Sequence, residues 1–539
     1  MSFVVTGLLG FVAFVAVFLG VVTLNVLYQV VRSSSCPVLM SVRAHHHLEF
    51  ALTGQATRPD IAASRIPLCS HHRLRCFYGP VFTYPLLGRW ITATLGPNGN
   101  NFVLNGKLAH VNAEEAYTHL TTPVFGTEVV YDVPNDILMQ QKKFVKVGLT
   151  TENFRKYVGI IHGEVIDYFS KTVFENDVKS VKQMDAFTTS SEITICTATA
   201  TLQGKEIRAG MDKSFADLYH DLDGGFTPLN FVFPNLPLPS YKRRDVAQLK
   251  MREFYIGILE KRRLSGEEPD ADMLTALQSQ VYKTGEPLTD KQIAHIMIAL
   301  LMAGQHTSAA TGAWSILRLG QRQDLQQSLY DEQVEYHGDG HGGFRPLEHD
   351  TLSTPLLAAV IKEVLRLHPP LHSLMRKVIS DCPVPASVGS PAAEPGISAA
   401  RAKELENVEY VVPKGHFVLA APGFSMVDDK IWGEGAKFDE TRWMDGKMPV
   451  AGEEDAEEED FGWGKISKGG KSAYLPFGAG RHRCIGEQFA NLQIGTIIAT
   501  LIREVTWTLP QEFPGNDYTT MIVMPQKPRN VIFTKRAKL

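Results

Sequence analysis

The stretch that most constrains the fold is FGAGRHRCIG, residues 477–486, with Cys484 close to its end. This cysteine follows a loop rich in glycine and cations and precedes an amphipathic run that starts at Glu487. A helix N-terminus and flanking cations both favour thiolate over thiol, so we expect Cys484 to ionise readily. Such a thiolate acts as a nucleophile, a metal ligand or the axial ligand of a haem iron. The alternative is a free cysteine buried in a glycine-rich turn.

Three neighbours favour the haem ligand. Gly480 and Gly486 allow a flat ring system to approach the backbone closely, and the aromatic ring of Phe477 can shield the sulfur. The spacing Phe-x-x-Gly-x-x-x-Cys-x-Gly resembles the haem-binding loop of the cytochrome P450 family. The resemblance implies haem b as the cofactor, with the iron held by the Cys484 thiolate.

A second motif lies in a long helix predicted to start near Thr289, where Thr289 and Gln292 match a capping box. The following run is strongly apolar and free of proline, yet it contains Gly304, His306 and Thr307. A glycine inside a helix costs about 1 kcal/mol relative to alanine, so this is a packing notch or a functional groove. Beside the cysteine loop it resembles the oxygen-binding helix of the same family. We therefore assign proton delivery to His306 and Thr307 as catalytic residues.

A third motif is the pair Glu363 and Arg366, which share one face of a predicted helix. Alone, such a pair is usually a weak surface contact. Here Arg442 follows in the segment 438–443, and this order resembles the Glu-Arg-Arg arrangement that buttresses the haem-binding core of the family. The resemblance gives Glu363, Arg366 and Arg442 that structural role. One departure is Glu440, where the family usually has proline.

Several details resemble one branch of the family, the fungal sterol 14-alpha-demethylases. His306 stands where most members carry an acidic residue, and His482 stands where many carry arginine. The block 117–132 is similar to the substrate-recognition region of that branch, and 225–231 and 371–376 also match. The resemblance covers 77–539 apart from a lengthened loop around 386–400. It implies removal of the 14-alpha-methyl group of lanosterol or 24-methylenedihydrolanosterol in three oxidations, within ergosterol biosynthesis.

The same resemblance implies further site residues and partners. Side chains at the haem propionates, where tyrosines and cations suit carboxylates, would be Tyr117, Tyr131, Lys142, Arg376 and His482. Side chains of the apolar sterol cavity, together with the notch at Gly304, would be Leu120, Thr121, Phe125, Phe226, Phe231, Leu371, Ser373 and Met521. The partners would be O2, a sterol and an NADPH-cytochrome P450 reductase. Its acidic surface would meet Lys465, Lys468 and Lys471, for which a solvated lysine face is the alternative.

The N-terminal segment predicts a membrane anchor. No charged residue occurs from Phe3 to Leu24, and about 20 such residues span a bilayer. Basic residues follow this run rather than precede it, so the positive-inside rule places the remainder in the cytosol. We expect residues 1–32 to anchor a single-pass protein in the endoplasmic reticulum membrane, rather than to form a cleaved signal peptide.

Residues 33–76 show no sustained period and do not match the family, so we treat them as an atypical linker. A translated intron or a shifted reading frame is a second hypothesis for this segment. If the segment is genuine, it leaves open an inactive haem- or sterol-binding homologue. Another open alternative is a P450 that acts on a different lipid.

Composition and periodicity complete the prediction. The 539 residues are 44% hydrophobic, which supports a large core, and the net charge of −4 gives no nucleic-acid footprint. The six cysteines lack the spacing of a zinc site or a disulfide framework. Short strands are predicted at 81–84 and 90–94, and helical periods at 149–175, 243–264, 289–320, 355–367 and 484–504. The expected fold is mainly α with small β-sheets (α+β), a P450 catalytic domain over 77–539.

Overall fold

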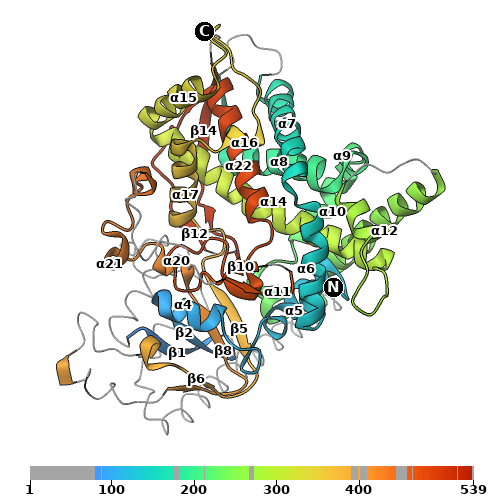
Figure 1. The fold of residues 1–539 in the computed structure, drawn as a ribbon, viewed down its shortest axis with the longest axis vertical. Helices are drawn as coiled ribbons and strands as arrows, with labels where there is room; N and C mark the ends of the chain where they lie inside the picture. The colour runs from blue at the N-terminus through green and yellow to red at the C-terminus, as the bar shows by residue number, and fades with distance from the viewer. Residues whose placement is uncertain are drawn as a thin grey trace, which may run out of the picture. The chain divides into compact units, whose positions relative to one another are not determined.

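The computed structural model describes residues 79–86, 88–174, 181–211, 213–265, 272–389, 398–400, 403, 410–444, 458–463, 465–518 and 520–536. The predicted anchor 1–32 and the whole atypical linker 33–76 lie outside these ranges. Apart from residues 85–89, the described chain belongs to one compact unit, which Figure 1 shows.

Helices dominate this unit. In the first half of the chain they are α4 (Gly96–Leu104), α5 (Glu114–Phe125), α6 (Asn135–Gly148), α7 (Thr151–Tyr168), α8 (Ala186–Ala198), α9 (Lys205–Ala209), α10 (Lys213–Asp223), α11 (Pro228–Val232) and α12 (Pro239–Ser265). In the second half they are α13 (Met273–Gln278), α14 (Asp290–Gln321), α15 (Gln323–His337), α16 (His349–Leu352), α17 (Pro355–Leu367), α18 (Ala386–Gly389), α20 (Pro422–Ser425), α21 (Asp429–Trp432) and α22 (Glu487–Glu504).

Short strands form small sheets beside the helices. The largest is five-stranded, in the order β1 (Val81–Leu86), β2 (Arg89–Thr94), β8 (Phe417–Ala420), β5 (Leu374–Val378) and β3 (Val111–Asn112). In it β2 and β8 are parallel, with Ile91 opposite Phe417, whereas β5 runs antiparallel to β8. The other sheets pair β11 (Val505–Thr508), β14 (Asn530–Lys535) and β4 (Val181–Asp185); β9 (Glu458–Asp460) and β10 (Lys465–Ser467); β12 (Asn516–Asp517) and β13 (Met524–Pro525); and β6 (Cys382–Pro383) and β7 (Val411–Val412).

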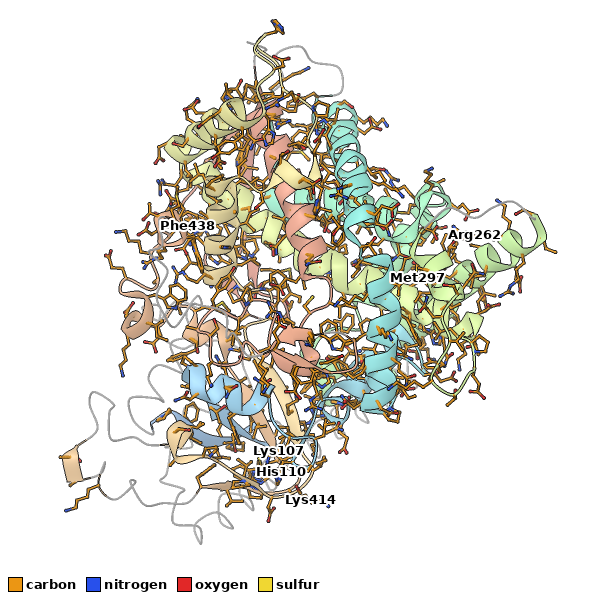
Figure 2. The ribbon with its side chains drawn as sticks, in the orientation of Figure 1. Lys107, His110, Arg262, Met297, Lys414 and Phe438 are labelled. Carbon is orange, nitrogen blue, oxygen red and sulfur yellow. The ribbon has the colours of Figure 1, made fainter. Side chains whose placement is uncertain are left out.

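The long helix α14 runs through the core and packs against α8, α12 and α22 (Figure 1). Its first turn carries the predicted capping box, in which the Thr289 hydroxyl and the Gln292 amide each bond to the other's backbone N–H. Met297, labelled in Figure 2, is fully buried in this helix. Among the described residues α14 is the helix that is long and apolar enough to cross a membrane. Most of it is buried, so its apolar sequence is explained by the core.

The predicted elements agree with the structure in type and differ at some ends. The predicted helix 355–367 is α17, and the predicted strands lie in β1 and β2. The helix predicted from 149 to 175 ends earlier, because α7 gives way to a wider π turn, η2 (Phe169–Val173). The helix predicted to begin at Cys484 begins only at Glu487. The acidic residues Glu458–Asp460 form the exposed strand β9, which pairs with β10.

The start of α17 is held by a buried carboxylate from another helix. Glu332 of α15 accepts bonds from the Thr354 hydroxyl at 2.6 Å and from the backbone N–H groups of Leu356 at 2.6 Å and Leu357 at 3.2 Å. The first N–H groups of a helix have no partner within the helix, and a carboxylate there also opposes the positive end of the helix dipole. Glu332 therefore fixes the direction in which α17, with Glu363 and Arg366, enters the core.

Replacing Glu332 by alanine tests this contact. We expect Glu332→Ala to lower the free energy of unfolding by about 2–3 kcal/mol, because buried donors lose their acceptor. The matched control is Glu335→Ala, which removes an exposed carboxylate from the same helix and should change stability by less than about 0.5 kcal/mol. Denaturant unfolding followed by tryptophan fluorescence measures both. Equal effects of the two substitutions would contradict the role of Glu332.

Candidate active site

The loop before α22 is held in shape by its own backbone. The Cys484 N–H donates to the Phe477 carbonyl at 3.0 Å, and the Arg483 N–H donates to the Gly480 carbonyl at 2.9 Å. Gly480 in turn donates to the Lys468 carbonyl at 3.0 Å, within η7 (Gly480–His482). These bonds fold residues 477–484 into a compact turn that presents the thiol of Cys484.

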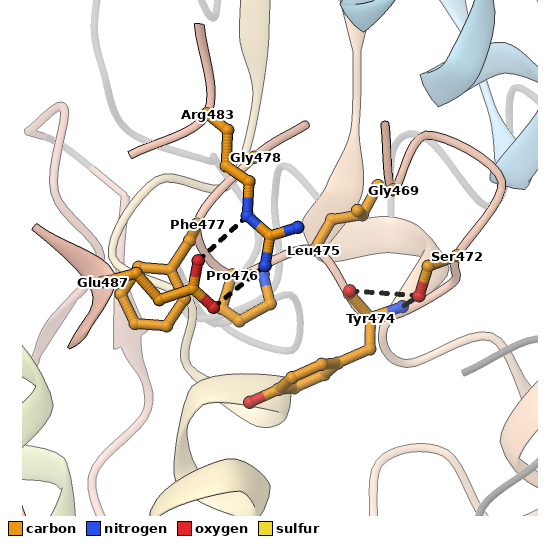
Figure 3. A pocket seen from close by; sticks show the side chains of 9 residues that line it. All are labelled: Gly469, Ser472, Tyr474, Leu475, Pro476, Phe477, Gly478, Arg483 and Glu487. Carbon is orange, nitrogen blue, oxygen red and sulfur yellow. Dashed lines mark hydrogen bonds and ion pairs between the residues drawn. The ribbon is translucent and has the colours of Figure 1, made fainter. Parts of the chain in front are cut away.

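A pocket lies against this loop. Its walls include the bidentate ion pair between Arg483 and Glu487, with bonds of 2.9 and 3.1 Å, which Figure 3 shows beside Phe477. The whole lining consists of Gly469, Ser472, Tyr474, Leu475, Pro476, Phe477, Gly478, Arg483 and Glu487. The ion pair joins the loop to the first turn of α22 and so fixes how the loop enters that helix.

The thiol of Cys484 faces open space inside the protein. Its side chain is exposed, yet the surrounding protein is dense enough that burial raises the pKa of Cys484. An exposed side chain and a pKa raised by burial are both expected when the Cys484 thiol borders a recess inside the protein rather than the outer surface. The other cysteines within the described residues, Cys196 and Cys382, are less exposed, and burial raises the pKa of each.

The prediction that Cys484 ionises readily is therefore wrong for the protein alone. The effect of burial, which raises the pKa of Cys484, is larger than the opposite effects of the Gly486 N–H, Lys142 and Arg483. The helix begins after the cysteine, with Gly486 as its N-cap, so the thiol receives one backbone bond instead of the full helix terminus. A thiol in this setting becomes a thiolate when a cation such as a metal ion binds it.

Lys142 of α6 binds the backbone of the thiol loop. Its ammonium donates to the carbonyls of Arg481 at 2.9 Å and Arg483 at 2.8 Å, and it lies 4.0 Å from the ring centre of Trp463. Trp463 also donates its indole N–H to the Arg481 carbonyl at 3.3 Å. Burial lowers the pKa of Lys142 to about 7, because no carboxylate in the described part of the chain offsets the loss of water.

Arg376, His482 and two tyrosines gather near Lys142. Arg376 of β5 is 4% exposed, and its guanidinium donates to the neighbouring Met375 carbonyl. Burial lowers the pKa of His482 far below its usual range, helped by Arg376 and Lys142. The Tyr131 ring in η1 (Val130–Asp132) lies 5.4 Å from Tyr117 and 6.2 Å from His482, and burial raises the pKa of Tyr131 to about 12.

This group of side chains fits a ligand with carboxylates. Lys142 and Arg376 form no ion pair with a carboxylate among the described residues, although buried cations are normally paired. The two propionates of haem would supply the missing negative charge beside a thiol that faces open space. All five side chains predicted at the propionates thus lie around the loop that carries Cys484.

The middle of α14 also borders open space. Ala303 is exposed although the helix around it is buried, and a Cβ added at Gly304 would meet no atom within 4 Å. The Thr307 hydroxyl donates to the Ala303 carbonyl at 2.9 Å, which leaves its oxygen free to accept. Ile485, next to Cys484, packs against the same cluster as Met302 of α14. A side chain added at Gly304 would thus enter open space rather than another helix.

His306 is part of a chain of polar groups. Its Nε2 lies 2.9 Å from Asp223 Oδ1 and 2.9 Å from the Tyr219 hydroxyl, both on α10. Tyr219 donates to Gln305 Oε1 at 2.6 Å, and the Gln305 amide donates to Ser191 at 2.6 Å. The Asp223 side chain is 42% exposed, whereas that of His306 is 18% exposed. The chain therefore leads from water at Asp223 to the buried face of α14.

The Glu-Arg-Arg arrangement forms around α17. Arg366 donates to both carboxylate oxygens of Glu363, at 2.8 and 2.7 Å, and both side chains are fully buried. Arg442 in η5 (Glu440–Trp443) has its Nε 3.6 Å from Glu363 Oε1. Glu440, the departure noted in the sequence, pairs with Arg322 at 3.4 Å. The departure therefore leaves Arg442 beside Glu363.

The side chains predicted to line the sterol cavity fall into two sets. Leu120 and Thr121 of α5 are buried, at 1% and 7% exposure. Phe125 and Phe226 pack with ring centres 5.5 Å apart. They belong to the half-buried set, which is Phe125, Phe226, Phe231, Leu371, Ser373 and Met521. Half-burial of large apolar side chains is expected where they border space that a ligand fills.

The lysines predicted to meet a reductase are partly paired. Lys465 lies on β10 and Lys471 is exposed, whereas Lys468 forms an ion pair with Glu459 at 3.4 Å. Lys468 and Lys471 also line a second pocket with Arg481, Asn101, Asn105, Glu459 and Phe461. These cations lie close to the thiol loop, because Gly480 bonds to Lys468.

Sequence reasoning missed Asp223, Tyr219 and Trp463. Asp223 and Tyr219 are four residues apart on α10 and share one helix face, but nothing in their sequence points to His306. Trp463 follows Phe461 and Gly462 just before the lysine segment. A tryptophan close to charged residues was the only hint in the sequence. Nothing there indicated that Trp463 would contact Lys142.

Comparison with known proteins gives a family match and a similar fold. A sequence model of the family described as cytochrome P450 matches residues 59–387 and 398–533. The match begins inside the segment assigned to the atypical linker and omits 388–397, within the lengthened loop. The solved structure of retinoic-acid-bound cyanobacterial CYP120A1 covers 88% of this chain and 95% of its own, with a TM-score of 0.69 and 19% identity. That likeness concerns the fold.

Three fungal relatives are similar over most of their length. Lanosterol 14-alpha demethylase of Mycosarcoma maydis is 54% identical over 474 residues, 86% of this chain and 83% of that protein. Lanosterol 14-alpha demethylase erg11 of Schizosaccharomyces pombe is 45% identical over 88% of this chain and 90% of its own. Eburicol 14-alpha-demethylase of Uncinula necator is 45% identical, with coverages of 86% and 85%.

Gly480 tests the thiol loop. Its φ is +63°, and a Cβ there would lie 2.3 Å from Asn105 Oδ1 and 2.8 Å from the Leu104 carbonyl oxygen. We expect Gly480→Ala to cost more than the roughly 1–2 kcal/mol of a left-handed alanine, because the loop must also shift. The measurement is the share of protein that gives the carbon monoxide Soret band of thiolate-ligated haem.

The matched control for Gly480→Ala is Gly159→Ala in α7, where the added Cβ meets no atom and φ is not positive. It should stabilise the helix by up to about 1 kcal/mol and leave the Soret band unchanged. A Gly480→Ala protein with the same Soret intensity as the control would show that the loop does not need glycine there.

Proposed function

The chain belongs to the cytochrome P450 family, and we propose that it is a sterol 14-alpha-demethylase acting on lanosterol or 24-methylenedihydrolanosterol. As a member it is a monooxygenase with haem held by a cysteine thiolate. The observation that carries the substrate proposal is its similarity, over most of the chain, to relatives named as lanosterol, sterol or eburicol 14-alpha demethylases. The product of three successive oxidations would enter ergosterol biosynthesis.

Cys484 is the residue we assign as the iron ligand. Its exposed thiol supports the choice over Cys196 and over Cys382, which is buried in strand β6. Haem b, when bound, supplies the oxidising centre, and a thiolate ligand favours cleavage of the O–O bond. Tyr117, Tyr131, Lys142, Arg376 and His482 would hold the propionates. The Gly480 and Gly486 backbone would lie against the ring, with Phe477 on the side of the thiolate.

The protein would bind the sterol by apolar contact. Three of the walls are phenylalanines: Phe125 from α5, Phe226 from the segment after α10, and Phe231 from α11. The chain before β5 adds Leu371 and Ser373, and the segment between β12 and β13 adds Met521. Apolar walls exclude water from the site and gain from burial of the sterol, about 25 cal/mol per Å² of apolar surface. Gly304 would leave the room that the reacting part of the sterol needs beside α14.

His306 would move protons with Asp223. An Nε2–H shared between Asp223 Oδ1 and the Tyr219 oxygen holds a proton at the cavity wall. Asp223 is exposed enough to take the next proton from water, and Thr307 Oγ1 is one residue further along the helix. Each oxidation of the sterol consumes protons, so this chain supplies them without opening the site to bulk water.

The proposed location rests on the uncharged N-terminal run and the basic residues after it, and the proposed partners rest on the family resemblance. Residues 1–32 would anchor the protein in the endoplasmic reticulum, residues 33–76 would connect, and 77–539 would form the cytosolic domain. An NADPH-cytochrome P450 reductase would dock on the cations near the thiol loop. Lys465 and Lys471 are the exposed members of that group, and charge complementarity mainly raises the rate of such docking.

Purified protein with a fungal reductase tests the proposed function. We expect the reduced carbon monoxide complex to give the thiolate Soret band, lanosterol to give a substrate-induced spectral shift, and NADPH to yield the 14-demethylated sterol with formate. Spectral shifts with fatty acids or other lipids but none with either sterol would favour the alternative, a P450 acting on a different lipid. Haem binding without the thiolate band would contradict Cys484 as the ligand.

Asp223 gives a sharper prediction. Asp223→Asn keeps the size of the side chain and an acceptor oxygen but removes the charge, so the residue beside His306 can no longer take up a proton from water and pass it on. We expect kcat for sterol demethylation to fall about 100-fold, the usual effect of losing general acid–base catalysis, with unchanged sterol binding by spectral shift. The matched control is Asp221→Asn on the same helix, where the carboxylate pairs with exposed Arg243 at 3.1 Å. A kcat equal to that of the control would exclude Asp223 from proton delivery.

A further inference from the structure

The segment 126–130 joins Phe125, at the end of α5, to Tyr131 in η1. Its backbone is unusual, with φ of +100° at Gly126, +67° at Glu128 and +54° at Val130. A positive φ is unfavourable for a β-branched residue such as valine. Strained backbone of this kind persists only where contacts hold it in place, so the contacts of this loop decide where Phe125 and Tyr131 lie.

The central contact is His295 of α14. Its Nδ1 lies 2.8 Å from the Thr127 carbonyl oxygen, and the residue is 2% exposed. A carbonyl only accepts, so Nδ1 carries the proton in this bond. Nε2 is buried without a partner among the described residues, and burial lowers the pKa of His295. The ring also fills the place of a side chain at Gly126, where an added Cβ would lie 2.4 Å from ring atoms.

Further contacts hold the loop, among them a bond of 2.8 Å from the Glu128 N–H to the exposed Asp132 carboxylate. The Gln141 amide of α6 donates to the Glu128 carbonyl at 2.9 Å, and its oxygen accepts from the Val130 N–H at 3.0 Å. Lys291 pairs with Glu128 at 2.6 Å, but their side chains are 40% and 50% exposed. An exposed ion pair contributes little. Val129 of the loop is also buried, in the cluster that contains Ile296 of α14. The buried hydrogen-bond tethers of the loop to neighbouring helices are Gln141 on one side and His295 on the other.

We propose that His295 is a positioning residue that sets sterol affinity without touching the sterol. It binds the loop to the same helix that carries Gly304 and His306, so Phe125 keeps its contact with Phe226 and Tyr131 keeps its place beside Tyr117. The effect on sterol rests on the proposed function. The effect on the loop itself does not, and the two are measured separately.

The test compares three variants of the full-length holoprotein. His295→Asn keeps an amide N–H near the position of Nδ1–H and should retain the bond, whereas His295→Leu removes it. We expect His295→Leu to raise the spectral dissociation constant and KM for lanosterol about tenfold, the effect of one buried hydrogen bond, with kcat within about twofold. His295→Asn and the control Lys291→Met, which removes only the exposed ion pair, should stay close to wild type.

Amide hydrogen exchange of residues 127–131 gives an independent readout. Exchange there should speed up about tenfold in His295→Leu, as expected for one lost tether, and remain slow in His295→Asn and Lys291→Met. Should His295→Leu fail to fold, His295→Gln serves instead, because its amide lies near the Nε2 position, away from Thr127. Unchanged exchange and unchanged lanosterol binding in the variant that lacks the donor would overturn the proposal, as would an Asn variant no better than Leu. If wild-type protein with a thiolate Soret band binds no sterol, the proposed function fails and the exchange data alone decide the role of His295.

Discussion

The buried pair of Glu363 and Arg366 determines where the thiol loop lies. Two fully buried charges are stable only when every remaining donor and acceptor is satisfied. Glu363 also accepts from the Asp439 N–H and the Trp443 indole, each at 2.9 Å. Arg366 donates to the carbonyls of Met426, Gly435 and Lys437. The pair thereby binds α17 to the irregular segment 426–443. Trp443 then packs on Tyr474 with ring centres 4.6 Å apart, and Tyr474 lines the pocket beside the Cys484 loop.

The charge balance around that loop explains why it suits an anionic cofactor. Lys142 has an aromatic face and two backbone carbonyls as neighbours, and Arg376 has a carbonyl, so neither charge is neutralised by the described residues. Burial, together with Arg376 and Lys142, lowers the pKa of the His482 ring far below its usual range. Bound carboxylates would raise the pKa of these groups and remove a cost that the protein bears alone. Folding and cofactor binding are therefore coupled at this site.

Local patterns predicted the elements, and tertiary packing decided the chemistry. Thr289 and Gln292 indicated the start of α14, because a capping box acts within a few residues, and the helical period over 355–367 indicated α17. The predicted ease of ionisation of Cys484 was wrong, because the sequence shows its flanking cations but not the protein that buries the thiol. The Glu363–Arg366 pair was recognisable only through its order among other motifs. Asp223 gave no signal at all, because its partner His306 lies on a helix far along the chain.

The contacts of His306 and the aromatic contact of Phe226 both depend on α10. Both hydrogen-bond partners of His306, Tyr219 and Asp223, lie on α10. Gln305 of α14 contacts this group only indirectly, because it accepts from Tyr219. Phe226 follows directly after α10 and packs on Phe125. A displacement of α10 that admits or releases a sterol would therefore separate Asp223 from His306 and Phe226 from Phe125 together. The His306–Asp223 contact and the Phe226–Phe125 contact therefore both depend on where α10 lies.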